Sequence, residues 1–237
     1  MKILHKEVRH ETALQPKGDC SCNLVKNTSE IKYSQRKGLV KRHILETLKW
    51  GAKVSNSDIL NGQGKTALDV GCAYGYGVDV LQTLGYDACG VDVSKYSPKK
   101  AKESFSADFL ACDVQKGLPF KENAFDLITC FEVIEHLEHP LWALKNMFAS
   151  CKGMIILTTP NKVVEKQIMK IMRDYDRTHI NVKAEKEWKR YIKNLNCGFS
   201  NVETFFDASL RVKNKLLFFK SFKMPYFGLS LRILIKK

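Results

Sequence analysis

A turn of small residues followed by spaced acids is the first stretch of this sequence whose residue types could do chemistry. It runs from Asp69 through Gly71 to Gly75 and comes directly after a short apolar run. Glycine lets a backbone approach a ligand closely, and the helix predicted behind the turn begins with unpaired N–H groups. Asp92 ends the next apolar run about 20 residues downstream, the distance at which an acid binds ribose hydroxyls. The pattern predicts a β-α-β unit that binds a nucleoside.

The spacing of the glycines narrows the choice of nucleoside. A dinucleotide fingerprint starting at Gly71 requires glycine at 73 and 76, where this chain has Ala73 and Tyr76. A phosphate-binding loop is excluded too, because no Gly-Lys-Ser/Thr follows the turn. The D-x-G-C-x-x-G pattern instead resembles the class I S-adenosylmethionine methyltransferases, from about Thr66 to Phe206. One departure is Ala73, which replaces the middle glycine of that family's loop.

The resemblance implies a donor site built from residues at strand ends. Gly71 and Gly75 would line the methionine and ribose side of S-adenosylmethionine, while Asp113 would face the adenine amino group. The residues that the resemblance assigns to the donor are Asp69, Gly71, Cys72, Ala73, Gly75, Asp92, Val93, Asp113, Val114 and Phe131. From the residues alone, Asp113 could equally cap a loop, so that alternative stays open.

A second candidate site is the acidic and histidine-containing segment after the fourth predicted strand. Glu132, Glu135 and His136 lie within five residues and could converge on one divalent cation, Mg²⁺ or Mn²⁺. Alternatively, the two carboxylates cap the next helix and His136 packs under the cofactor. The segment resembles metal-dependent ubiquinone-biosynthesis O-methyltransferases and, more weakly, small-RNA 2′-O-methyltransferases. The second resemblance implies His179 as a fourth ligand, and either histidine could also act as the catalytic base.

The order of the predicted elements indicates how these residues are brought together. Apolar runs predict strands over 66–70, up to 92, and over 107–112, 125–131, 153–159, 199–206 and 229–235, alternating with helical patterns. Such alternation predicts an α/β fold with a doubly wound, Rossmann-like, seven-stranded sheet and helices on both faces. The resemblance adds an antiparallel last strand. We expect a loosely ordered arm over 1–28, a helical cover over 29–60 and the methyltransferase domain over 61–237.

Composition limits the binding partners and the cellular compartment that can be expected for this protein. The chain has 237 residues, and its formal net charge of +14 makes an anionic partner more probable without identifying one. We find no apolar stretch that predicts a transmembrane segment and no signal-peptide core, and cysteines within apolar runs suggest free thiols, so a cytoplasmic protein is expected. Anionic membrane or RNA could bind the basic N-terminal helix and residues 211–227, although the latter could be only solvated strand edges.

These observations favour one function and leave two alternatives. The leading hypothesis is an O-directed methyltransferase acting on a small-molecule, quinol or lipid-like, or glycan acceptor. One alternative is an RNA 2′-O-methyltransferase with an Mg²⁺ or Mn²⁺ site. The other is a catalytically silent subunit with the same fold, which the intact set Asp69, Gly71, Gly75, Asp92 and Asp113 argues against.

Overall fold

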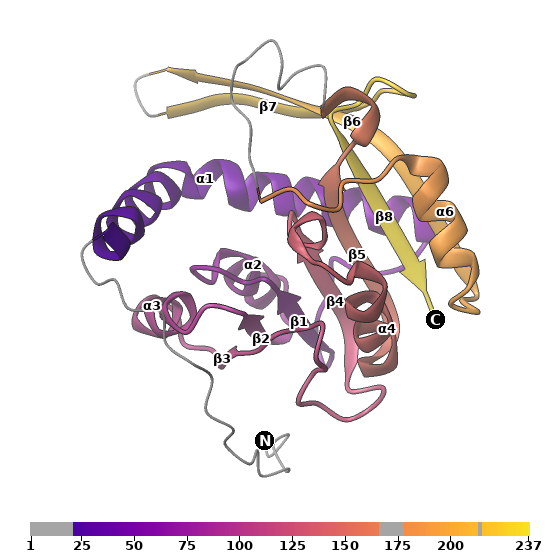
Figure 1. The fold of residues 1–237 in the computed structure, drawn as a ribbon, viewed down its shortest axis with the longest axis horizontal. Coiled ribbons are helices and arrows are strands. Elements are labelled where there is room, and N and C mark those ends of the chain that lie inside the picture. The colour runs from indigo at the N-terminus through magenta and orange to yellow at the C-terminus, as the bar shows by residue number, and fades with distance from the viewer. Residues whose placement is uncertain (1–20, 166–177, 213–214) are drawn as a thin grey trace.

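The computed structural model describes residues 21–165, 178–212 and 215–237 of the chain (Figure 1). Its strands are β1 (Thr66–Val70), β2 (Asp87–Asp92), β3 (Phe109–Ala111), β4 (Phe125–Phe131), β5 (Cys151–Pro160), β6 (Phe199–Val212), β7 (Lys215–Lys223) and β8 (Ser230–Lys236). Its helices are α1 (Ser21–Ser55), α2 (Tyr76–Thr83), α3 (Tyr96–Ser104), the 3₁₀ turn η1 (Ile134–His136), α4 (Pro140–Ser150) and α6 (Glu185–Lys193).

All eight strands form one sheet, in the order β3-β2-β1-β4-β5-β8-β6-β7. The strands from β3 to β5 pair in parallel, and the order reverses direction at β1, which is the arrangement of a doubly wound sheet. The last strand, β8, lies between β5 and β6 and is antiparallel to both. The predicted α/β class and antiparallel last strand are confirmed.

The strand count is a correction, because the sheet has eight strands rather than seven. β6 continues past Phe206 to Val212, and β7 pairs back along it in antiparallel fashion from Phe205↔Lys223 to Val212↔Lys215. Sequence reasoning treated the lysine-rich aromatic run within 211–227 as a surface. Its first part is a strand, because one edge of β6 is left for another strand to pair with once β8 occupies the other.

Helices cover both faces of the sheet, as predicted (Figure 1). On one face α1, α2 and α3 bury a cluster that includes Leu48, Leu81 and Ala101. On the other, α4 and α6 bury Leu144 and Trp188. The start of α3 is fixed by Ser94, whose Oγ accepts hydrogen bonds from the N–H groups of the first helical residues.

The N-terminal helix is longer than the pattern predicts. α1 begins at Ser21, inside the segment expected to be an arm, and continues to Ser55. Residues 1–20 lie outside the described residues, as does most of the helix expected over 163–173. α1 is held to the C-terminal strands by His43, whose Nδ1 lies 2.5 Å from Oδ2 of Asp207 on β6.

The remaining sequence-level expectations about compartment concern membranes and thiols. Among the described residues, no helix has both the length and the apolar composition needed to cross a bilayer. The cysteines whose state the structure gives are all free thiols, namely Cys72, Cys89, Cys112, Cys130, Cys151 and Cys197.

Candidate cofactor and metal site

The turn between β1 and α2 can be made only by small residues. Gly71 and Gly75 have φ angles of 75° and 84°, and Ala73 has a φ of 43°, all in the left-handed region. A Cβ atom on Gly71 would lie 2.2 Å from Cγ2 of Val133, so a side chain there would overlap the segment after β4. The turn is closed by N–H groups of Gly71 and Cys72, which both donate to the carbonyl of Val91. The turn is therefore bonded to the backbone of β2 and packs against the Val133 side chain that follows β4, at the carboxyl edge of the sheet.

Asp92, the predicted ribose ligand, lies at the end of β2 and is joined to this turn. Its Oδ2 accepts a hydrogen bond from the N–H of Ala73 at 3.0 Å, and its Oδ1 accepts one from the N–H of Ser94 at 2.8 Å. The carboxylate is thereby oriented by two backbone groups on opposite sides. Val93, next to it, is 74% exposed and offers an apolar surface along the same edge.

Asp69 differs from the other acids because it is buried. The hydroxyl of Thr129 donates a hydrogen bond to its Oδ1 at 2.7 Å. Burial, together with the negative charge of Asp92, raises the pKa of Asp69 to about 7, and the Thr129 hydrogen bond only partly opposes this. A Cβ on Gly77 would lie 2.1 Å from the Asp69 Oδ2, so the carboxyl group packs against the first turn of α2. The buried Asp69 side chain thus supports the turn between β1 and α2 from the protein interior.

The predicted adenine residues follow the short strand β3. Oδ1 of Asp113 accepts a hydrogen bond from the N–H of Gln115 at 3.0 Å, as in the loop-capping alternative, and Lys116 lies 3.7 Å from its Oδ2. Asp113 remains half-buried, whereas Val114 is only 5% exposed and packs in the core. Asp113 is therefore the more accessible of the two.

A small cavity lies above the turn, and α1 forms one of its walls. Its volume is about 60 Å³. It is lined by Val40, Ile44, Asp69, Gly71, Cys72, Ala73, Tyr74, Tyr76, Gly77 and Phe131. Pockets for drug-sized ligands measure roughly 300–1,000 Å³, so this space takes only one end of a nucleoside-sized molecule. Asp92 and Asp113 are not part of its lining and extend the site along the sheet edge. Val40 and Ile44 belong to the segment expected to form a helical cover over 29–60, although the sequence named neither of them as a site residue.

The acidic segment after β4 places a carboxylate in a dry environment. Glu132 has a φ of 53° and is exposed, and the chain then enters η1. Glu135 within η1 is 0% exposed, and neither carboxylate oxygen has a hydrogen-bond partner among the described residues. Burial, followed by the nearby charge of Glu132, raises the pKa of Glu135 to about 9. Nε2 of His136 lies 3.9 Å from Oε1 of Glu135, and a bound cation is another way in which proteins satisfy a buried carboxylate.

Two histidines complete a cluster around this carboxylate. Ligand atoms of Glu135, His136 and His179 all lie within 4.8 Å of one another. Nδ1 of His136 is 2.8 Å from the hydroxyl of Thr178, and Nδ1 of His179 is 2.5 Å from Oε1 of Glu165. The predicted Glu132 lies outside the cluster.

The cluster is assembled by contacts that no local pattern reveals. The N–H of Asn181 donates to the carbonyl of Glu135 at 2.8 Å, and its Nδ2 donates to the carbonyl of Leu137 at 2.6 Å. These bonds hold the segment that carries His179 against η1. Glu165 and Thr178, which orient the two histidines, were missed in the sequence because only the fold brings them to the site.

Comparison with known proteins identifies what this architecture resembles. The sequence profile of the methyltransferase domain family matches residues 35–204. The ubiquinone biosynthesis O-methyltransferase of Actinobacillus pleuropneumoniae is 26% identical over 141 residues, which cover 55% of this chain and 60% of that protein. The mitochondrial ubiquinone biosynthesis O-methyltransferase of Schizosaccharomyces pombe is 29% identical over 119 residues, covering 46% of this chain and 42% of that protein. The matches thus span about half the length of these relatives.

Solved structures share the fold at low sequence identity. A SAM-dependent methyltransferase from Archaeoglobus fulgidus superposes with a TM-score of 0.64 at 18% identity, over 89% of this chain and 99% of that one. The magnesium protoporphyrin IX methyltransferase of Synechocystis, solved with bound SAH, gives a TM-score of 0.57 at 14% identity, over 83% of each chain. At these identities the likeness concerns the fold alone.

Proposed function

This chain belongs to the class I S-adenosylmethionine-dependent methyltransferases, and from that premise we propose that it methylates a hydroxyl oxygen of a small acceptor. The acceptor classes are quinols, other lipid-like molecules and glycans. The observation that carries the proposal is the cluster of Glu135, His136 and His179 at the carboxyl edge of the sheet. A hydroxyl must lose its proton to accept a methyl group, whereas an amine needs no such cluster. The ubiquinone O-methyltransferases among the relatives support the same acceptor atom.

The residues along the sheet edge fit the donor. Gly71 and Ala73 bring backbone close to it, Asp92 holds the ribose hydroxyls, and Asp113 binds the adenine amino group. S-adenosylmethionine supplies a methyl group on a positively charged sulfur. Val40, Ile44 and Phe131 are apolar lining residues of the cavity above the turn and would exclude water from the bound donor. Excluding water and aligning donor and acceptor is the main contribution that such residues make to the rate.

The cluster also fits a divalent cation. A buried carboxylate and two imidazoles are a donor set that Mn²⁺ accepts, and Mg²⁺ accepts the carboxylate with retained water. Glu165 would hold His179 in position, since carboxylates commonly orient metal-binding histidines. Such a cation would lower the pKa of an acceptor hydroxyl group bound to it. Without it, His136 or His179 would take the acceptor's proton, and both roles use the same side chains.

A second candidate is 2′-O-methylation of RNA. It is favoured by the position of His179 beside Glu135, the arrangement that the small-RNA methyltransferases' motif implies, and by the net charge of +14. The thiols described above are free, which supports a reducing, cytoplasmic compartment for either reaction.

Transfer of labelled methyl groups tests both candidates. The purified full-length chain is incubated with methyl-labelled S-adenosylmethionine and, separately, with small-molecule, lipid and RNA fractions. Label in a hydroxyl-bearing small molecule or lipid supports the proposal, and label in RNA supports the second candidate. Tight binding of the donor by calorimetry with no label in any fraction would instead indicate a silent subunit.

A further inference from the structure

The C-terminal hairpin concentrates exposed apolar side chains. Of the thirteen large apolar side chains that are exposed among the described residues, seven lie between Leu210 and Leu229. We call the hairpin surface the set formed by Leu210, Lys220, Phe222, Met224, Tyr226 and Phe227. β6 and β7 carry the first three beyond the rest of the sheet, alongside α1 (Figure 1). Scattered apolar residues on a surface are ordinary, but seven on one hairpin and the loop that follows it indicate an interaction site.

The loop at the base of the hairpin is fixed rather than frayed. The hydroxyl of Thr204 donates a hydrogen bond to the carbonyl of Met224 at 2.8 Å, and the carbonyl of Thr204 accepts one from the N–H of Met224 at 3.1 Å. A Cβ on Gly228 would lie 2.5 Å from the backbone nitrogen of Phe205, so the loop backbone packs directly on β6. Held in this way, Tyr226 is 71% exposed and Phe227 is 66% exposed.

The exposed charge that the structure describes on β7 is positive, at Lys220 and Lys223, whereas Arg232 in β8 is buried and Lys236 lies at the far end of that strand. From residue 208 to the C-terminus the sequence has eight basic residues and no acid. Nζ of Lys220 lies 5.2 Å from the centroid of the Phe222 ring. The side chain of Lys223 is 67% exposed, and its Nζ lies 3.1 Å from Oε2 of Glu203. Lys220 thus shares one face of β7 with Phe222, whereas Lys223 lies on the opposite face, beside Glu203.

The hairpin surface adjoins the carboxyl edge of the sheet, where the candidate site lies. Asn161 directly follows β5, and its Nδ2 donates to the carbonyls of Tyr226 and Gly228 at 3.3 and 2.9 Å. On the same edge Ile180, the neighbour of His179, is 55% exposed. A partner bound to the hairpin surface would therefore lie close to the opening of the site.

We propose that the hairpin surface docks this protein on an anionic lipid bilayer. Apolar and aromatic side chains enter the boundary between headgroups and acyl chains, and Lys220 stays at the phosphates. RNA would use the aromatic rings for stacking, but it gives Leu210 and Met224 no comparable partner. Docking in this orientation turns the carboxyl edge of the sheet toward the bilayer. It does not depend on the identity of the methyl acceptor.

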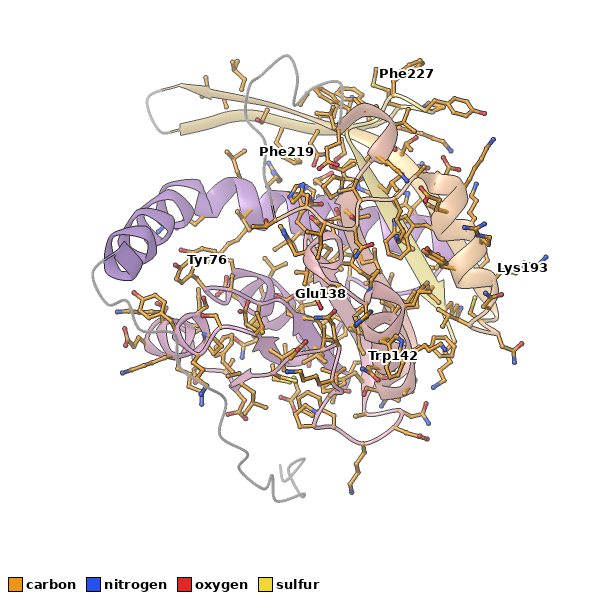
Figure 2. All side chains as sticks on the ribbon, viewed as in Figure 1. Tyr76, Glu138, Trp142, Lys193, Phe219 and Phe227 are labelled. Atoms are coloured by element: carbon orange, nitrogen blue, oxygen red, sulfur yellow. The ribbon has the colours of Figure 1, made fainter. Side chains whose placement is uncertain are left out.

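Sedimentation of the full chain with vesicles tests this proposal without any turnover. With vesicles of phosphatidylglycerol and phosphatidylcholine at low salt we expect the protein to sediment with lipid, and to do so less as salt rises. Changing Tyr226→Ser and Phe227→Ser together should weaken partitioning by about tenfold or more. Trp142→Ser is the matched control, because Trp142 on α4 is 67% exposed and lies away from Phe227 (Figure 2).

The lysines provide an independent arm of the test. Lys220→Gln should reduce binding roughly fivefold, whereas Lys223→Gln, on the opposite face of β7, and Lys99→Gln and Lys145→Gln, on α3 and α4, should not. Melting curves confirm that each variant is folded, which is expected because all four side chains are exposed. Equal binding to pure phosphatidylcholine, no loss in either set of hairpin variants, or absence of sedimentation at low salt would overturn the proposal. Tighter binding to a uridine oligonucleotide than to the vesicles would assign the surface to RNA and overturn it as well.

Discussion

Among single residues, Asp92 has two roles, one in the turn and one in donor binding, and removing its carboxylate tests both. It orients the turn through Ala73 and is proposed to bind the ribose. Asp92→Ala leaves these partners without an acceptor, at a cost of about 1–3 kcal/mol, so we expect the Kd for S-adenosylmethionine to rise by roughly 5- to 150-fold. Titration calorimetry measures this. Asp87→Ala, an exposed acid at the start of β2, should leave the Kd unchanged, and an unchanged Kd for Asp92→Ala would refute the assignment.

Glu135 provides the residue-scale test of the cation. If the cluster binds Mn²⁺ or Mg²⁺, a chelator should abolish turnover and either ion should restore it, and Glu135→Gln should remove the dependence together with the activity. Glu165→Gln, which frees His179 from its orienting carboxylate, should weaken Mn²⁺ binding by roughly 10- to 100-fold. The control is Glu138→Gln, because Glu138 is exposed and outside the cluster. Full activity in excess chelator would leave the histidines as proton acceptors only.

Among the secondary-structure elements, helix α1 is held in position by one network of polar side chains. Asp207 accepts hydrogen bonds from His43 on α1 and Ser221 on β7, and Arg232 on β8 lies 3.5 Å away. The Arg232 guanidinium is only 4% exposed and stacks 3.9 Å above the Phe205 ring. A helix and three strands are therefore joined through one carboxylate. The same helix contributes Val40 and Ile44 to the cavity, so the network also maintains that wall.

Replacing this carboxylate should destabilise the protein in a pH-dependent way. Burial alone would raise the pKa of Asp207, but hydrogen bonds from His43 and Ser221 and the charge of Arg232 outweigh it and lower the pKa. A lowered pKa stabilises the fold above the unfolded value of about 3.9, and this stabilisation is lost as pH falls through the folded pKa. We expect Asp207→Asn to cost about 1–3 kcal/mol at pH 7.

Urea unfolding at pH 7 and near pH 3 measures the effect. The difference between Asp207→Asn and the parent should shrink at the lower pH, where the parent's carboxylate becomes protonated. Asp108→Asn, on the exposed start of the β3 segment, is the control and should differ little from the parent at either pH. A difference that is the same at both pH values would show that charge at Asp207 does not hold α1.

For the molecule as a whole, strand β8 determines the cooperativity of unfolding. It pairs with both β5 and β6, and its side chains alternate between the two hydrophobic clusters. Ile233 packs in the cluster under α4 and α6, whereas Leu234 packs in the cluster under α1 and α2, and both are 0% exposed. The last strand in the sequence thus lies inside the sheet and joins its two layers.

Truncating either side chain should therefore destabilise the whole domain. We expect Ile233→Ala and Leu234→Ala each to cost about 2–5 kcal/mol, in a single unfolding transition. Chemical denaturation followed by tryptophan fluorescence and by circular dichroism measures both the cost and the coincidence of the transitions. Lys236→Ala, at the exposed end of the same strand, is the control. Separate transitions by the two probes would show that the two layers unfold independently.

The sequence by itself determined the features that depend on local spacing. The left-handed positions at Gly71 and Gly75, the acid at the end of β2 and the alternation of strands with helices follow from residue types a few positions apart. Such patterns reflect backbone sterics and hydrophobic periodicity, which act locally, so they predicted the doubly wound sheet, whereas the methyltransferase family was implied by the resemblance of the D-x-G-C-x-x-G turn.

Only the tertiary structure decided which distant groups meet. It left Glu132 outside the cluster in which the family motif had placed it, brought Glu165 and Thr178 to the two histidines, and paired His43 with Asp207. It also made residues 215–223 a strand, because an open edge of β6 was there to receive them. These contacts join residues far apart in the chain, and their free energy comes from burial and pairing that exist only once the sheet has formed. For that reason no local pattern in the sequence encodes them.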